Sequence, residues 1–212
     1  DKDIVGSIEF LEVEGLQGST YLLKGPNGEQ VKLNQSEVAD EDEFEIGEEY
    51  SFFVYPNRSG ELFATQNMPD ITKDKYDFAK VLKTDRDGAR IDVGLPREVL
   101  VPWEDLPKIK ELWPQAGDYL LVTLRIDSNN QMFGRLASET IVEGMFTPVM
   151  DDSKQNEMIE ARAYRLLRVG SFLLSEDGYK IFVHESERKQ EPRLGEKVEV
   201  RIIGHNDKGE LN

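Results

Sequence analysis

The sequence contains no cysteine, only two histidines and no run of about 18 apolar residues. The missing cysteines exclude disulfides and thiolate metal sites and are typical of a protein in a reducing cytoplasm. The missing apolar run excludes a membrane-spanning helix. The two histidines, His184 and His205, fit no spacing of zinc ligands. We therefore expect a cytoplasmic protein with no metal site, no cofactor and no membrane partner.

Catalytic motifs are also missing. The sequence has neither a glycine-rich phosphate loop nor the strand-turn-helix pattern of a nucleophile elbow. Carboxylate pairs suited to acid–base catalysis are conceivable among 42 aspartates and glutamates, but nothing separates them from ordinary solvated charge. The sequence therefore predicts a protein without catalytic residues.

Negative charge is plentiful but uneven. The chain has a net charge of −16, and residues 1–66 hold 15 acidic and 4 basic side chains, a net of −11. Residues 67–158 hold 17 acidic and 12 basic side chains, a net of −5, whereas residues 159–212 hold 10 of each. A polyanion such as RNA would therefore meet the least repulsion in the C-terminal third.

What the sequence does contain is a threefold internal repeat. Each copy has a strand, an acidic turn, a glycine, a second strand with alternating apolar residues, and a turn rich in Asp, Asn and Gly. The glycines are Gly47, Gly117 and Gly195, which lie 70 and 78 residues apart. This spacing suits a small five-stranded barrel. Unrelated β-hairpins are the alternative, and the shared order of five features makes them a poorer explanation.

The repeat predicts an all-β fold of three tandem five-stranded barrels. We place the first at residues 1–66, the second at residues 67–143, and a linker with the third at residues 144–212. Short helices are expected near residues 107–113 and between Ser138 and Gly144. The third copy stops at Asn212, partway into its last strand by analogy with the first copy, so we expect this barrel to be incomplete.

The most informative stretch is residues 178–187, which reads as a strand of aromatic and β-branched residues. Ile181 and Val183 alternate with larger or polar residues, so the strand has two distinct faces. Its histidine, followed by Glu-Ser-Glu, resembles the third strand of the S-one RNA-binding domain, an OB-type barrel. Residues 169–173, Val-Gly-Ser-Phe-Leu, resemble the second strand of that domain, which reads aromatic-Gly-Ala-Phe-Val.

This resemblance implies a binding site for single-stranded RNA on the third barrel. In S-one domains, aromatic residues of the second strand and a histidine of the third commonly stack on bases, and here Phe172 and His184 match them. Val169 stands where the family often has its first aromatic residue. Both matching residues have structural alternatives, because Phe172 also suits a barrel core and His184 also suits a hydrogen bond to the following turn.

Three cations near this face, Arg168, Lys180 and Arg201, are candidates for phosphate contacts, although most surface cations bind nothing specific. The first two repeats lack the motif, since Asn34 and Pro102 occupy the histidine position. The very acidic first repeat is predicted to contact a protein rather than RNA.

Taken whole, the chain resembles the conserved virulence factor B family of Gram-positive bacteria. The resemblance is carried by residues 3–8, 65–69, 93–96 and 202–212. It implies three S-one-type barrels followed by a winged-helix domain, which would lie beyond Asn212. It also implies a bacterial RNA-binding protein that regulates virulence-gene expression. A protein-interaction scaffold that contacts the transcription or translation machinery remains the alternative.

Overall fold

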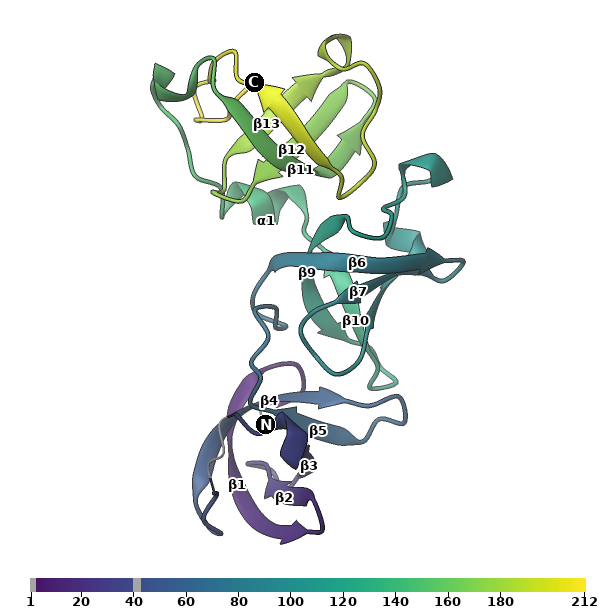
Figure 1. Cartoon of the computed structure of the whole chain (residues 1–212), viewed down its shortest axis with the longest axis vertical. Helices are drawn as coiled ribbons and strands as arrows, with labels where there is room; N and C mark the ends of the chain where they lie inside the picture. Colours follow the sequence, from purple (N-terminus) through teal and green to yellow (C-terminus); the bar gives the residue numbers. More distant parts are fainter. Residues whose placement is uncertain (1–2, 40–42) are drawn as a thin grey trace. The chain divides into compact units, whose positions relative to one another are not determined.

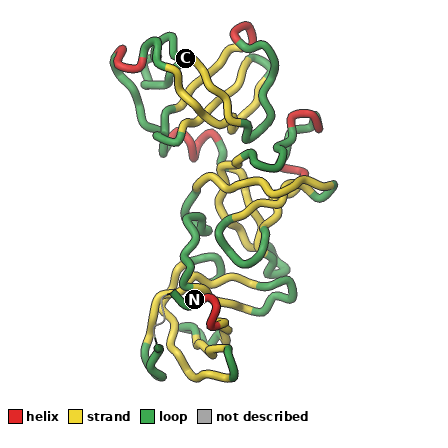
Figure 2. The backbone as a smooth tube through the Cα atoms, in the orientation of Figure 1, coloured by secondary structure: helices red, strands yellow, loops and turns green. Residues whose placement is uncertain are grey.

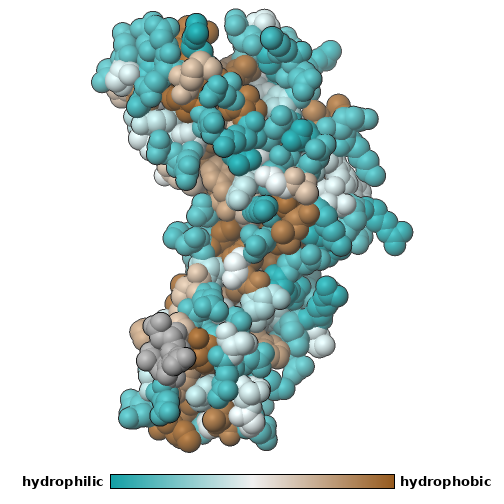
Figure 3. Space-filling model, in the orientation of Figure 1, coloured by the Kyte–Doolittle hydropathy of each residue, from teal (hydrophilic) through white to brown (hydrophobic). Residues whose placement is uncertain are grey.

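A computed structural model describes residues 3–39 and 43–212, and in these residues it contains fourteen β-strands, one short α-helix and five 3₁₀-helices. Figures 1 and 2 show that strands dominate the fold and form three groups along the chain. Among the described residues, every helix is too short or too polar to span a membrane. The surface seen in Figure 3 is mostly hydrophilic, as expected for a chain in which 32% of the residues are charged.

The first group is a closed five-stranded barrel. Its strands are β1 (Ile8–Gln17), β2 (Thr20–Lys24), β3 (Gln30–Asn34), β4 (Glu49–Pro56) and β5 (Leu62–Thr65). They follow one another around the barrel in the order β1-β2-β3-β5-β4, and β1 pairs with β4 to close it. The parallel pairing of β3 with β5 gives the barrel the OB-type topology.

The second group repeats this topology. Its strands are β6 (Asp77–Asp85), β7 (Gly88–Asp92), β8 (Val99–Pro102), β9 (Tyr119–Ile126) and β10 (Met132–Leu136). They form a closed barrel in the order β10-β8-β7-β6-β9. This is the cyclic strand order of the first barrel, listed in the opposite direction. The third and fifth strands are again parallel, with Phe133 opposite Leu100.

The third group is a four-stranded sheet. Its strands are β11 (Met158–Leu167), β12 (Gly170–Ser175), β13 (Lys180–His184) and β14 (Lys197–Arg201), in the order β13-β12-β11-β14. Leu211 forms a parallel bridge with Ile181, where the first two barrels place their fifth strand. The predicted all-β fold of three tandem barrels, with the last one incomplete, is therefore confirmed.

Inward-facing residues of the third sheet form its core, as the alternation in the sequence predicted. Val198, Val200 and Ile202 pack against Leu173 and Ile181 from the facing strands. The charged residues between them on β14 remain exposed. Because burial of apolar side chains is the main stabilising contribution to such a small domain, this alternation fixes which face of each strand points outward.

The repeated glycines explain why the three copies share one pattern. Gly47, Gly117 and Gly195 have φ values of 91°, 93° and 85°, a left-handed conformation that residues with a Cβ rarely adopt. The N–H of each donates a hydrogen bond to a carbonyl of the first strand of its own barrel, at 2.8, 2.9 and 2.7 Å. In each of the three barrels, a glycine just before the fourth strand is therefore hydrogen-bonded to the first strand.

Both predicted short helices are present. The 3₁₀-helix η3 spans Lys110–Leu112, and the α-helix α1 spans Glu139–Glu143. Ser138 caps α1, since its hydroxyl accepts a hydrogen bond from the Ile141 N–H at 3.3 Å. The barrel limits at residues 66 and 143 stay predictions.

Candidate nucleic-acid interface

A row of aromatic rings lies on the outward face of the third sheet. Phe172 on β12 is directly opposite Phe182 on β13, and their ring centroids are 4.9 Å apart. The Phe182 ring meets the imidazole of His184 at 6.4 Å, and the Phe172 ring meets that of Tyr164 at 6.2 Å. The structure thus brings Phe172 and His184 together on one face, joined through Phe182. We call these four residues the aromatic platform.

Gly170 creates the space in which the Phe182 ring lies. A Cβ added to Gly170 would stand 2.5 Å from both the ring edge of Phe182 and the carbonyl oxygen of Val183. Gly170 also lies directly opposite His184 in the ladder between β12 and β13. The glycine of the second-strand motif therefore lets an aromatic ring lie against the backbone beside the histidine.

His184 is exposed and orients itself by capping the next turn. Its Nδ1 accepts a hydrogen bond from the Ser186 N–H at 3.1 Å, at the start of the 3₁₀-helix η5 (Glu185–Glu187). His184 therefore does form the hydrogen bond to the following turn that is the structural alternative to a role in binding. This hydrogen bond does not hide the ring, because only one nitrogen is used and the side chain remains in solvent.

Lys180 is buried, whereas a residue that contacts a phosphate group of RNA must be accessible. Its side chain is only 3% exposed, and its ammonium group pairs with Glu139 at 2.5 Å, with Glu143 at 2.6 Å and with Glu210. Those three carboxylates are close enough together to suit a cation, and the lysine ammonium contacts all of them. The proposed role of Lys180 in phosphate binding therefore finds no support in its placement, because α1 and its carboxylates surround the charge.

Electrostatics keep this cluster charged. Burial alone would lower the pKa of Lys180, but hydrogen bonds with Glu139, Glu143 and Glu210 outweigh burial and raise it. Burial likewise opposes ionisation of Glu139, yet the hydrogen bond and the charge of Lys180, together with hydrogen bonds from Arg165 and Tyr164, bring its pKa below the usual range. Lys180 shares the face of Phe182 and His184 on β13 and lies 5.2 Å from the Phe172 ring centroid, so the buried cation borders the platform where α1 covers the sheet.

Tyr164 is anchored at the same helix. Its hydroxyl donates to the carboxylate of Glu139 at 3.2 Å, and Arg165 pairs with that carboxylate at 3.2 Å. Burial raises the pKa of Tyr164, and the neighbouring charge of Glu139 raises it further, so the phenol stays protonated. The Arg165 guanidinium lies 5.4 Å from the Phe172 ring centroid and adds a cation to the platform.

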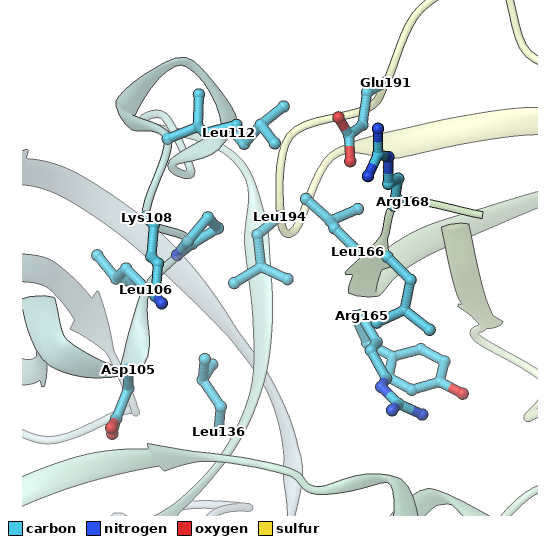
Figure 4. Close-up of a pocket in the computed structure, with 14 residues that line it drawn as sticks. Asp105, Leu106, Lys108, Leu112, Leu136, Arg165, Leu166, Arg168, Glu191 and Leu194 are labelled. Atoms are coloured by element: carbon cyan, nitrogen blue, oxygen red, sulfur yellow. The ribbon is translucent and has the colours of Figure 1, made fainter. Parts of the chain in front are cut away.

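The other two predicted cations each border a hollow that a platform residue also lines. Arg168 is exposed and lines a pocket together with Tyr164 and Arg165 (Figure 4). Arg201 is exposed on β14 and lines a hollow between β13 and β14 that His184 also borders. In the first two barrels the fifth strand occupies the space between the third and fourth strands, so we assign no ligand to this hollow.

The same positions carry different residues in the other two barrels. After the third strand of each barrel, the next backbone N–H donates to a carbonyl just before the second strand, as Glu185 does to Val169 at 2.8 Å. The equivalent bonds of Gln35 and Trp103 place Asn34 and Pro102 at the position of His184, as predicted. The pairing of β2 with β3 then aligns Leu22 with Phe172 and Lys32 with Phe182.

Two platform residues, Phe182 and Tyr164, are not among the RNA-binding residues predicted from the sequence. Phe182 has the same parity as His184 on β13, so the alternation contained the signal that places both on one face. Tyr164 gave no such signal, because a register shift between Ala163 and Arg165 breaks the alternation of β11.

Comparison with known families agrees with this architecture in all three barrels. The model described as "S1 domain" matches residues 5–67, and "CvfB first S1-like domain" matches residues 76–135. The model described as "Virulence regulatory factor CvfB, second domain" matches residues 145–212. The fold and these matches define a bacterial protein of tandem S-one-type OB domains.

Whole-chain similarity gives the family. "Conserved virulence factor B" of Staphylococcus epidermidis is 91% identical over all 212 residues, and that of Staphylococcus aureus is 85% identical. In both cases the chain covers 71% of the relative. A crystal structure of a multidomain protein with nucleic acid binding domains from Streptococcus pneumoniae superposes with a TM-score of 0.86 at 29% identity, covering 98% of this chain and 72% of the other. The chain belongs to the conserved virulence factor B family.

Proposed function

We propose that this protein binds single-stranded RNA on the aromatic platform of the third barrel and regulates gene expression, including that of virulence genes, without catalysing a reaction. The observation that carries the proposal is the row of Tyr164, Phe172, Phe182 and His184 on one outward face. Aromatic rings stack on any base, and each stacked base contributes roughly 1–3 kcal/mol.

The position of the platform supports the same function. OB-type barrels bind oligonucleotides on the face of their second and third strands, and here the rings of Phe172 and Phe182 lie on β12 and β13. The related pneumococcal structure is described as having nucleic acid binding domains, and the staphylococcal relatives are named as virulence factors. Residues 159–212 carry no net charge, so the third barrel lacks the repulsion that the acidic first barrel would exert on RNA.

A titration of fluorescein-labelled, unstructured single-stranded RNA tests the proposal. We expect binding that weakens as salt rises, because phosphate contacts release counterions. The double variant Phe172→Ala with His184→Ala should bind at least about tenfold more weakly, since base stacking is lost.

The matched control places the same change on the first barrel. Leu22→Ala with Asn34→Ala alters the two equivalent positions and should leave RNA affinity at the parental value. Equal affinities for the parent and the Phe172/His184 variant, with both folded by circular dichroism, would refute the platform as the RNA site.

A protein-interaction role is the second candidate, and one observation favours it for the first barrel. Phe10 on β1 is 68% exposed, in a segment with a net charge of −11. An exposed aromatic residue in acidic surroundings suits a basic protein surface better than RNA. Capture of one stoichiometric protein partner that persists after RNase treatment, and that Phe10→Ala abolishes, would favour this role.

A further inference from the structure

Beside the aromatic platform lies a pocket of about 480 Å³. Figure 4 shows Leu112, Leu166 and Leu194 facing the same space, between the 105–112 segment and the end of β11. All of its lining residues belong to one compact unit of the chain, which contains residues 101–122 and 136–212. Its size lies within the range of about 300–1,000 Å³ that is usual for small-ligand sites.

The pocket continues the platform rather than standing apart from it. Tyr164 and Arg165 line the pocket, and both also contact Phe172, the central ring of the platform. A single-stranded RNA whose bases stack on Phe182 and Phe172 would therefore reach the pocket by passing over Tyr164. Apolar walls next to an aromatic ring suit the flat, weakly polar face of a nucleobase.

The charges around the pocket favour a phosphate group. Lys108 and Arg168 are exposed, and neither forms an ion pair within the part of the chain that the structure describes. The pocket also contains two carboxylates and a third cation. Asp105 is the first carboxylate, Glu191 pairs with Arg188 at 4.0 Å, and Arg165 pairs with Glu139. The net lining charge is therefore positive.

We propose that this pocket holds one further nucleotide of the bound RNA, with its base between the leucines and its phosphate on Lys108 and Arg168. This inference rests on the proposed RNA binding by the platform. It gives Arg168 a role away from the stacked bases, and it adds Lys108 from the second barrel to the RNA site. Affinity should then increase in one step once an RNA is long enough to reach beyond Tyr164.

The experiment measures affinity for single-stranded RNAs of increasing length, from about 4 to 16 nucleotides, at several salt concentrations. Lys108→Ala with Arg168→Ala removes the two cations, and Leu112→Trp fills the pocket from a half-buried position. For the longer RNAs we expect each variant to bind about five- to tenfold more weakly. The charge variant should also lower the salt dependence by about 0.7 per lost phosphate contact.

The control for total charge is Lys80→Ala with Arg86→Ala, which removes one lysine and one arginine from exposed positions outside the pocket. It should leave the length step intact. The shortest RNA that the platform alone holds should bind every variant equally. Parental binding with an unchanged step in both pocket variants would overturn the pocket proposal alone. If the parent binds no RNA of any length, the proposed function fails as well. Should Leu112→Trp not fold, the charge variant still decides the question.

Discussion

The first and third barrels share a strand order but present different outward faces. At equivalent positions the first barrel has Leu22 and Lys32, whereas the third has Phe172 and Phe182. Buried aliphatic side chains make up most of both cores, although the first also buries Phe52. Their charges differ, because residues 1–66 carry −11 and residues 159–212 carry zero.

The difference shows which positions the fold requires and which it leaves free. Inward residues and the left-handed glycines are needed to close each barrel, so they recur. Outward positions on the second and third strands contribute little to closure, so they are free to differ between the barrels. The predictions below test whether the third barrel owes its properties to those outward residues.

The largest effect is expected at Lys180. Replacing it by methionine leaves Glu139, Glu143 and Glu210 without the ammonium group that they share. Removing one partner of a buried charge cluster typically destabilises by about 3–5 kcal/mol, and we expect about 3 because the carboxylates are partly exposed. Hydrogen exchange of the β12 and β13 amides measures the loss.

Lys32→Met on the first barrel is the matched comparison. Lys32 pairs with Glu61 at 3.0 Å, but both side chains are about half exposed, so the local exchange rates should hardly change. Equal losses in the two barrels would mean that the burial of Lys180 does not distinguish the third barrel.

The next effect is expected at Gly170. In Gly170→Ala the new methyl group would collide with the Phe182 ring and the Val183 carbonyl, so we expect about 1–3 kcal/mol of destabilisation and a displaced ring. RNA affinity should fall with it. Urea unfolding followed by circular dichroism measures the first effect, and RNA titration measures the second.

Gly15→Ala provides the same substitution on the first barrel. A Cβ at Gly15 would meet nothing within 4 Å, so this variant should be neutral or slightly more stable. If Gly170→Ala were equally harmless, the close approach of Phe182 would not need a glycine.

The sequence was sufficient for the fold because the repeat and the strand alternation are local patterns. It also placed Phe172 and His184 on one barrel, by motif. It also suggested Lys180 as a phosphate contact, a prediction that the placement of this residue does not favour, because α1 covers it from about 40 positions earlier in the chain. No local pattern reports such a contact. Tyr164 was missed for a related reason, since a bulge changes its face.

The smallest effect is expected from moving the platform to the first barrel. In the Phe172→Ala, His184→Ala background, the graft changes four positions of the first barrel to their counterparts in the third: Thr20→Gly, Leu22→Phe, Lys32→Phe and Asn34→His. We expect no more than about a twofold recovery of RNA affinity, because residues 1–66 carry a net charge of −11, which becomes −12 when Lys32 is replaced, and this charge repels phosphate. RNA titration at low and high salt measures the recovery.

The salt series separates the two contributions to the comparison. If stacking alone decided RNA binding, the grafted barrel would approach the affinity of the parent at every salt concentration. If charge also decides, the graft should gain relative to the parent as salt screens the repulsion within about 10 Å at 0.1 M. The second outcome would show that an outward aromatic face needs a neutral barrel beneath it before it can hold RNA.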